Sequence, residues 1–237
     1  MGGLILSQIP LVLGIIMSPL AIIAVVAVLF SERARGNSIA FLTGWFLAIV
    51  VAVGGSYLVL TILEVHERQD PPLWVPILHI IIGVVLLVGA WFIYSRLRHR
   101  LHAMALATGP GEIAAAAPQL PKMLQSVEHF TAFRSGLLGF GLFILNPVDA
   151  SCALAAAMNL RLSSISATGQ LACAVLFCVI AASSVAIPVG MLLIRKEEAA
   201  APLATIRNWI ATNTKLLNVG LLVLIAAMQL SKGIQGL

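Results

Sequence analysis

Charged side chains are scarce in this sequence. Asp, Glu, Lys and Arg make up 10% of its 237 residues, whereas 60% of the residues are hydrophobic and the mean hydropathy is +1.05. An ordinary soluble domain has about 25% charged residues. The scarcity of charge therefore excludes a typical soluble fold and predicts an integral membrane protein.

Cysteine and histidine are also few, with three and five residues. A membrane conduit for thiol electrons needs an exchangeable dithiol. Cys173 and Cys178 diverge around a helix axis, however, and Cys152 has no cysteine opposite it. His79 stands alone in its apolar segment, so no ligand cluster supports a metal site or metal export. No nucleotide motif is present, and we expect no enzyme, no cofactor and no dedicated metal site.

Long uncharged stretches, in contrast, are abundant. A helix needs about 20 apolar residues to cross a hydrocarbon layer of about 30 Å. Six stretches are candidates: residues 1–31, 36–63, 71–95, 135–160 (with Asp149 inside), 162–194 and 216–231. The last reaches spanning length if its helix starts near Trp209 and Lys215 extends to the membrane surface. We therefore expect an all-α polytopic protein with six transmembrane helices.

Lys and Arg are distributed unevenly between the two sets of loops. One set holds Arg33, Arg35, Arg96, Arg98, Arg100, Lys122, Arg134, Arg195, Lys196, Arg207 and Lys215; the other holds Arg68, Arg161 and Lys232. The positive-inside rule assigns the richer set to the cytoplasm and both termini to the outside of the cytoplasmic membrane. The basic excess then faces anionic lipid headgroups, so it requires no nucleic acid partner.

Two prolines follow small polar residues at matching places in apolar segments, as Ser18-Pro19 and Asn146-Pro147. A proline frees backbone carbonyls, which persist in a bilayer core only where protein or a watery cavity receives them. Both pairs lie near the middle of their spans at about 1.5 Å rise per residue. We therefore expect helices 1 and 4 to be broken at these prolines.

A long polar interruption divides the chain into residues 1–96 and 134–237, each with three predicted spans. An odd number of spans inverts one half relative to the other, as in many secondary transporters. We therefore expect two inverted three-helix repeats whose breaks meet at one level. The cytoplasmic linker, residues 97–133, holds apolar residues at helical spacing between Leu120 and Phe130. It is either an interfacial amphipathic helix or an ordinary solvated linker.

The candidate substrate-binding residues are Ser18, Pro19, Asn146, Pro147 and Asp149. Asp149 is the one acidic residue well inside a predicted span, and such residues are functional candidates. Desolvation without a nearby cation favours its protonated form, so we expect Asp149 to carry protons during transport. The alternatives are a permanently neutral carboxyl group that binds a neighbouring helix, and ordinary helix packing at the proline break.

Other buried polar residues are candidates for a polar lining of the path. These are Gln8, Asn218 and Gln229, although such residues more often bind a neighbouring helix. Gly54 and Gly55 are predicted to allow close helix packing, because small residues let backbones approach.

Several stretches carry a family resemblance. They read Leu13-Gly-Ile-Ile-Met-Ser-Pro-Leu-Ala-Ile-Ile-Ala-Val, then Ser31-Glu-Arg-Ala-Arg-Gly-Asn, Ala40-Phe-Leu-Thr-Gly-Trp and Leu145-Asn-Pro. On these residues the chain resembles the GAP or Sap group (peptidoglycolipid- and sulfolipid-addressing proteins) of actinobacteria, within the lysine-exporter (LysE) superfamily. The resemblance implies a 3+3 membrane carrier linked to moving cell-envelope glycolipids or related amphiphiles outward.

The second motif departs from the family pattern. Family members tend to read Asn-Pro-Lys-Asn there, whereas this chain reads Asn146-Pro147-Val148-Asp149. The basic residue is lost and an acid is gained, which leaves room for a cationic, zwitterionic or proton-coupled ligand.

The function we expect is a secondary transporter or exporter. It would move a lipid, glycolipid or other amphiphile across or out of the cytoplasmic membrane, with proton coupling through Asp149. The alternative is a non-transporting membrane scaffold that assists a lipid-export machine. The expected partners are the amphiphilic substrate and membrane lipids, and both functions are compatible with a homo-oligomer.

Overall fold

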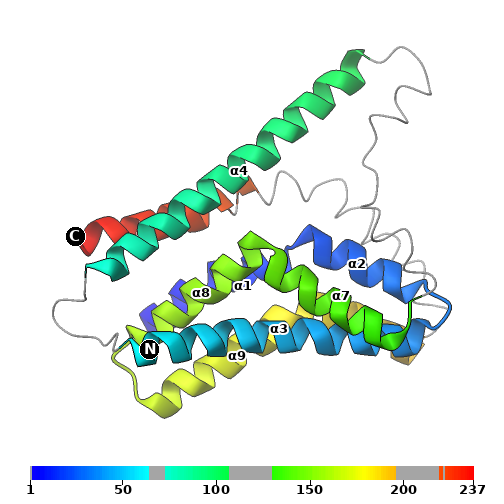
Figure 1. Ribbon diagram of the computed structural model, residues 1–237, viewed down its shortest axis with the longest axis horizontal. Helices are drawn as coiled ribbons and strands as arrows, with labels where there is room; N and C mark the ends of the chain where they lie inside the picture. The colour runs from blue at the N-terminus through cyan, green and yellow to red at the C-terminus, as the bar shows by residue number, and fades with distance from the viewer. Residues whose placement is uncertain (1, 64–72, 107–129, 196–218, 221) are drawn as a thin grey trace.

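The chain folds into α-helices that lie mostly along one long axis (Figure 1). A computed structural model describes residues 2–63, 73–106, 130–195, 219–220 and 222–237, and these contain no strand. The helices are α1 (Gly2–Ile16), α2 (Pro19–Leu29), α3 (Ala34–Ile62), α4 (Trp74–Leu106), α7 (Ala132–Leu145), α8 (Pro147–Arg161), α9 (Ala167–Arg195) and the C-terminal helix Leu222–Gln235. The all-α prediction is confirmed for the described residues.

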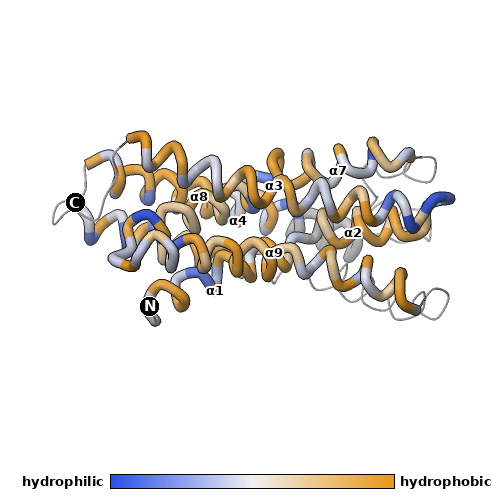
Figure 2. Tube along the Cα trace, turned by 90° about the horizontal axis from the view of Figure 1, so that it is seen from below, coloured by the Kyte–Doolittle hydropathy of each residue, from blue (hydrophilic) through white to orange (hydrophobic). Residues whose placement is uncertain are grey.

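Three helices are long and apolar enough to cross a membrane by themselves. They are α3, the Trp74–Arg96 part of α4 and the Ala167–Ile194 part of α9. At 1.5 Å per residue, the 29 residues of α3 exceed the thickness of a hydrocarbon core of about 30 Å. Hydrophobic residues predominate along the length of the molecule, and a hydrophilic stretch lies at its end beside α2 (Figure 2). These lengths and this composition are those of a membrane protein.

Further spans require pairs of bent helices. The α1–α2 pair bends by 48° and the α7–α8 pair by 70°, and counting each pair as one span gives up to five spans. The C-terminal helix Leu222–Gln235 is apolar but too short to be counted by itself. The expected start of a sixth span, near Trp209 and Lys215, lies outside the described residues. The six-span count therefore stays a prediction.

Proline alone does not break these helices. Pro10 lies inside α1 and Pro188 lies inside α9, and both helices continue through them. The breaks occur where Pro19 and Pro147 begin new helices, directly after the N-cap residues Ser18 and Asn146. Ser and Asn are favoured N-caps, and proline is tolerated at the first helical position. The predicted breaks are confirmed, and the polar residue before each proline distinguishes these two positions from Pro10 and Pro188.

The central helix of the bundle is α3, which contacts α2, α7, α8 and α9. Its closest approach is to α7, through glycines. A Cβ atom on Gly44 would clash with the carbonyl oxygen of Gly136, and one on Gly139 would clash with that of Phe41. By contrast, a Cβ atom on Gly54 would meet nothing within 4 Å, and the same holds for Gly55. The prediction of close packing at Gly54 and Gly55 is therefore wrong, because an apolar groove between α3 and α9 lies at this part of α3.

Aromatic rings fill the space beside this glycine contact. Trp45 stacks on Phe41 at a centroid distance of 6.4 Å and meets the edge of Phe143 at 5.2 Å. All three side chains are buried, with exposed fractions of 1% or less. Aromatic pairs of this geometry contribute about 0.5–1.5 kcal/mol beyond their burial. The Gly44-Trp45 pair therefore fixes α3 against α7.

A second unit consists of α4 and the C-terminal helix, which lie together at one side of the bundle (Figure 1). A Cβ atom on Gly83 would lie 2.7 Å from the Leu230 side chain, and one on Gly233 would lie 2.9 Å from the carbonyl oxygen of Pro76. These glycines let the two helices pack closely. The helix α4 also contacts α8 and extends to Leu106, past the expected end of its span at residue 95. The predicted linker helix at residues 120–130 falls almost entirely outside the described residues.

Candidate functional site

The first helix break presents the Ser18 side chain. Ser18 has extended backbone angles, φ −61° and ψ 111°, and its amide donates to the Ile15 carbonyl oxygen at 3.1 Å. Pro19 has no N–H, so the hydrogen-bond pattern of α1 ends here. The Ser18 hydroxyl forms no capping bond to α2 and is therefore available to a partner outside its own helices.

The second break has the same local form. Asn146 has φ −82° and ψ 109°, and its amide donates to the Phe143 carbonyl oxygen at 3.2 Å. Its side-chain Oδ1 accepts from the amide of Val148 at 3.1 Å, which caps α8. The Nδ2 group of Asn146 remains as a donor. Each break therefore consists of an extended polar residue followed by a proline.

Asp149 joins the two breaks. Its Oδ2 accepts from Ser18 Oγ at 3.0 Å and from Asn146 Nδ2 at 2.7 Å, and Asn146 Nδ2 also donates to Ser18 Oγ at 3.3 Å. These residues lie 128 or more positions apart across the breaks. We call Ser18, Asn146 and Asp149 the break cluster. It is where α1–α2 and α7–α8 meet, near the middle of the bundle (Figure 1).

The carboxyl group of the break cluster is buried beside two helix N-termini. Asp149 has an exposed fraction of 0% and Ser18 of 3%. Asp149 stands in the first turn of α8, and Ser18 is the N-cap of α2, so two helix N-termini lie beside the carboxyl group. Each N-terminus carries a partial charge of about +0.5. The Oδ1 atom of Asp149 has no hydrogen-bond partner within the described residues, so the group can hold a negative charge or take up a proton.

The remaining predicted site residues lie elsewhere. Gln8 donates from Nε2 to the Ala156 carbonyl oxygen at 3.1 Å, so it ties α1 to α8. It also lines an apolar groove of about 220 Å³ between α1 and α9. Gln229 accepts from His79 Nδ1 at 2.6 Å and ties the C-terminal helix to α4. Asn218 lies outside the described residues, and thus the break cluster brings together only Ser18, Asn146 and Asp149 with their prolines.

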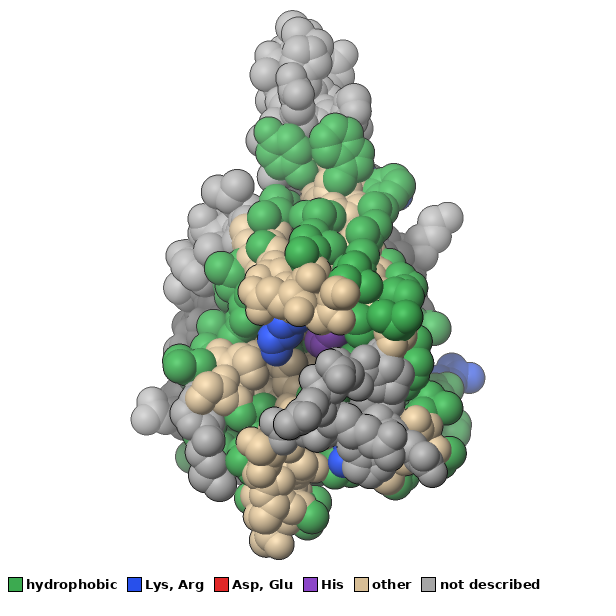
Figure 3. Space-filling model, turned by 90° about the vertical axis from the view of Figure 1, so that its left-hand side faces the viewer, with side chains coloured by type: hydrophobic (Ala, Val, Ile, Leu, Met, Phe, Trp, Pro, Cys, Tyr) green, Lys and Arg blue, Asp and Glu red, His purple; other side chains and the backbone are tan. Residues whose placement is uncertain are grey.

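A polar cleft lies at the end of the molecule where both termini are found, and we call it the terminal cleft. Its volume is about 590 Å³. Its polar side chains are Ser7 of α1, His79 of α4, Asn159 of α8, Ser163 and Ser164 of the following loop, and Lys232 and Gln235 of the C-terminal helix. A basic side chain and a histidine lie side by side in the hollow of this face (Figure 3). The terminal cleft separates the central bundle from the α4 unit.

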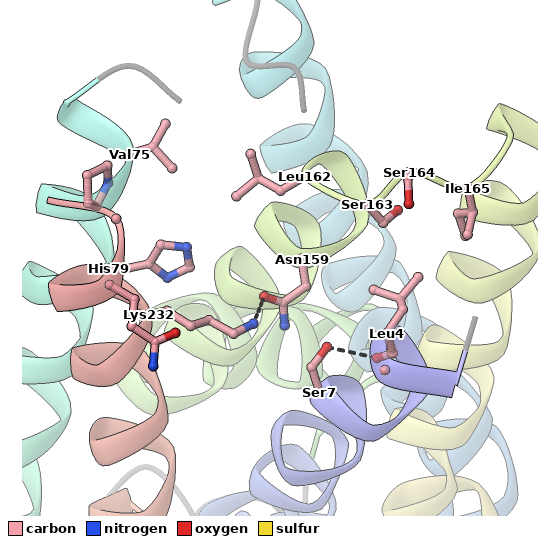
Figure 4. Close-up of a pocket in the computed structure, with 14 residues that line it drawn as sticks. Leu4, Ser7, Val75, His79, Asn159, Leu162, Ser163, Ser164, Ile165 and Lys232 are labelled. Carbon is pink, nitrogen blue, oxygen red and sulfur yellow. Dashed lines mark hydrogen bonds between the residues drawn. The ribbon is translucent and has the colours of Figure 1, made fainter. Parts of the chain in front are cut away.

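Lys232 crosses the terminal cleft. Its Nζ donates to Asn159 Oδ1 at 2.6 Å, while His79 and Ser7 approach the same space from α4 and α1 (Figure 4). Asn159 and His79 are largely buried, with exposed fractions of 7% and 4%. The sequence places Lys232 in a loop and His79 alone in its apolar segment, and it indicates no role for Asn159. The available signal was a lysine and an asparagine near the same membrane surface, which became informative only once α8 and the C-terminal helix were adjacent.

Cysteines and other metal ligands are dispersed through the bundle. Cys152, Cys173 and Cys178 are all free thiols. Among the described residues, no group of three or more His, Cys, Asp or Glu side chains is placed to hold a metal ion.

Comparison with known proteins gives one family. A family model described as Sap, sulfolipid-1-addressing protein, matches residues 9–235. This range includes both proline breaks and the polar residues of the terminal cleft except Ser7. No curated protein and no solved structure matches the chain.

Proposed function

The chain belongs to the Sap, or sulfolipid-1-addressing protein, family, and from this premise we propose that it moves a lipid, glycolipid or other amphiphile across the cytoplasmic membrane. We propose a secondary transporter whose substrate path opens between the two helix breaks. The observation that carries the proposal is the break cluster, in which Asp149 joins Ser18 of one break to Asn146 of the other. Broken helices that face each other at mid-membrane are characteristic of binding sites in secondary transporters.

The proposed mechanism treats residues 1–96 and 134–237 as two inverted halves. Corresponding helices of the two halves run in opposite directions along the bundle: α1–α2 opposes α7–α8, and α3 opposes α9 (Figure 1). Exchanging α1, α2 and α3 with α7, α8 and α9 converts each contact between these two sets of helices into another contact between them that exists. The pairs are α1–α8 with α2–α7, α1–α9 with α3–α7, and α2–α9 with α3–α8. This correspondence supports alternating access by rocking of one half against the other.

The proposed orientation has both termini outside. Arg33, Arg35 and Arg134 lie at the turns where α3 and α7 begin, and α4 carries Arg96 towards the same end. Arg161 and Lys232 lie at the opposite end, beside the terminal cleft or in it. The positive-inside rule then assigns the Arg-rich end to the cytoplasm.

Proton coupling follows from the hydrogen bonds of Asp149. As a carboxylate, Asp149 accepts charge-assisted bonds from Ser18 and Asn146, which are about twice as strong as neutral ones. A proton on Asp149 removes the charge and weakens both bonds. Because Ser18 belongs to the first half and Asp149 to the second, protonation loosens the contact between the halves. Proton binding would thereby favour opening of the path.

The experiment measures lipid movement in liposomes that contain the purified protein. A fluorescent glycolipid is followed from one leaflet to the other, with and without an imposed pH gradient. We expect wild-type flux to increase with the gradient and Asp149→Asn flux to lose this response, because asparagine cannot exchange a proton. The control Glu32→Gln removes a negative charge from the exposed turn before α3 and should respond as the wild type does. Undiminished proton coupling in Asp149→Asn would contradict the mechanism.

The second candidate is a membrane scaffold that assists a separate lipid-export machine. The complete burial of Asp149 favours it, since a buried and hydrogen-bonded carboxyl group can serve packing alone. A folded wild-type protein that moves no lipid probe in liposomes under any gradient would support the scaffold over the transporter.

A further inference from the structure

Two helices of the opposite halves begin with matching sequences. Ala34-Arg35-Gly36-Asn37 begins α3 and Ala167-Thr168-Gly169-Gln170 begins α9, so the fourth residue of each helix carries a side-chain amide. The backbone amides of Asn37 and Gln170 both donate at 2.9 Å to the residue that precedes their helix. The helices α3 and α9 begin at opposite ends of the bundle (Figure 1). The same local structure therefore occurs once at each end.

The turns that lead into these helices also match. Ser31 follows α2, and its Oγ donates to the carbonyl oxygen three residues earlier at 2.7 Å. Ser163 follows α8 and forms the equivalent bond at 2.6 Å. Asn37 Nδ2 donates to Ser31 Oγ at 3.0 Å, and Gln170 Nε2 donates to the Ser163 carbonyl oxygen at 3.2 Å. Each amide therefore holds the far end of a half-helix that begins at a proline break.

Both amides also bind a segment outside their own turn. Asn37 Nδ2 donates at 2.8 Å to the carbonyl oxygen of Phe130, which lies two residues before α7. Gln170 Oε1 accepts from the Tyr57 hydroxyl group of α3. Asn37 and Gln170 are buried, with exposed fractions of 0% and 7%. The end of α2 is thus tied to the start of α7, and the end of α8 is tied to α3.

The other ends of α2 and α8 meet in the break cluster. Ser18 is the N-cap of α2 and Asp149 stands in the first turn of α8, and one hydrogen bond joins them. Each half-helix is therefore held by a shared contact in the middle of the bundle and by an amide at its own end. If the shared contact opens, Asn37 still holds α2 and Gln170 still holds α8.

We propose that α2 and α8 are paired gates, with Asn37 holding α2 closed at the cytoplasmic end and Gln170 holding α8 closed at the outer end. The proposal rests on the proposed transport function and its orientation. Alternating access needs a closure towards each side of the membrane, and the two matching contacts supply one at each end. Both contacts are formed in the structure, which is therefore closed at both gates.

The test measures the reaction of Cys152 from each side of the membrane. In the full chain with Cys173→Ala and Cys178→Ala, a membrane-impermeant maleimide is added to right-side-out or to inverted membrane vesicles. Cys152 is fully buried one turn after Asp149, so a faster reaction requires an opening towards the side that holds the reagent. Mass spectrometry measures the rate of modification.

Two variants each remove one hydroxyl group from a gate contact. Tyr57→Phe detaches Gln170 from α3 and should increase the reaction from the outside about fivefold, with no increase from the cytoplasmic side. Ser31→Ala detaches α2 from Asn37 and should do the reverse. The controls Thr61→Ala and Thr43→Ala remove hydroxyl groups of α3 that donate within their own helix, and both should react as the wild type does.

A faster reaction from both sides in both variants would indicate general loosening and would overturn the proposal. Unchanged rates in Tyr57→Phe would also overturn it, and this conservative variant decides the test if Ser31→Ala fails to fold. If each variant opens the side opposite to the expected one, the gates stand and the orientation is inverted. Sided opening without lipid flux removes the proposed transporter and leaves the gates, whereas lipid flux without sided opening does the reverse.

Discussion

Asp149 accepts hydrogen bonds from residues of two helix breaks that are far apart in the sequence. Ser18 contributes the bond that crosses between the α1–α2 segment and the α7–α8 segment. Cys152 lies one turn after Asp149 and is fully buried, with an exposed fraction of 0%. Its thiol therefore reports on whether this contact opens.

The prediction at this scale concerns the rate of Cys152 modification. In a protein with Cys173→Ala and Cys178→Ala, N-ethylmaleimide should modify Cys152 slowly. Adding Ser18→Ala removes the Ser18 hydroxyl, which donates to Asp149 Oδ2 and accepts from Asn146 Nδ2. A net loss of about 1 kcal/mol should increase the open fraction and the modification rate about fivefold. Mass spectrometry of the modified protein measures the rate.

The matched control for this measurement is Thr43→Ala, which removes an exposed hydroxyl that bonds only to the Ile39 carbonyl oxygen of its own helix. It should leave the Cys152 rate unchanged. Equal rates in Ser18→Ala and wild type would show that the Ser18–Asp149 bond does not hold the breaks closed.

At the scale of helices, the contact of α3 with α7 depends on glycine. Gly44 and Gly136 face each other so closely that a methyl group cannot be accommodated without moving the backbone. Backbone approach of this kind is a main source of helix association in membranes, because lipid offers no hydrophobic driving force between helices. Gly54 lies on the same helix and faces open space.

Gly44→Ala should therefore destabilise the protein, whereas Gly54→Ala should not. Overpacking costs about 1–3 kcal/mol, which corresponds to a decrease of about 2–10 °C in the unfolding temperature. Thermal unfolding of the purified protein in detergent measures both variants. A decrease of the same size in Gly54→Ala would mean that loss of glycine itself, and not the contact with α7, is responsible.

At the scale of the whole molecule, the two ends of the bundle differ in charge and in form. The end at which α3 begins carries Arg33 and Arg35 on an exposed turn. The other end holds the terminal cleft with Lys232 as its positive charge. The proposed orientation assigns the first end to the cytoplasm and opens the terminal cleft to the outside.

Single cysteines test this orientation in intact cells. In a protein without its native cysteines, Ser164→Cys should react with a membrane-impermeant maleimide, because the Ser164 loop would face outward. Gly36→Cys should react only after the cells are permeabilised, because the first turn of α3 would face the cytoplasm. Both positions are exposed, so accessibility within the protein does not limit either reaction. The opposite pattern would invert the orientation and place the terminal cleft inside.

Much of the fold was predictable because its determinants are local. Long apolar stretches predict long helices, and an N-cap residue followed by proline ends one helix and begins another. Ser18-Pro19 and Asn146-Pro147 could therefore be located from the sequence, as could the buried carboxyl group of Asp149. The sequence also placed the two breaks at similar depth, which made their meeting an expectation.

The partners of the individual side chains required the tertiary structure. Gln8 and Gln229 are both glutamines between apolar residues in the sequence. In the structure, Gln8 bonds to a backbone carbonyl of α8, whereas Gln229 bonds to His79 of α4. Gly44 and Gly54 are both glycines of the same apolar helix, and only the packing of other helices against α3 distinguishes them.

The sequence by itself determined a helical membrane protein with two proline breaks and one buried acid, because these follow from hydropathy, capping and backbone chemistry along a single segment. Only the tertiary structure decided that Asp149 bonds to Ser18 and that Lys232, Asn159 and His79 line one cleft. Such contacts depend on the rotation and spacing of helices that are distant in the chain, and no local pattern encodes those quantities.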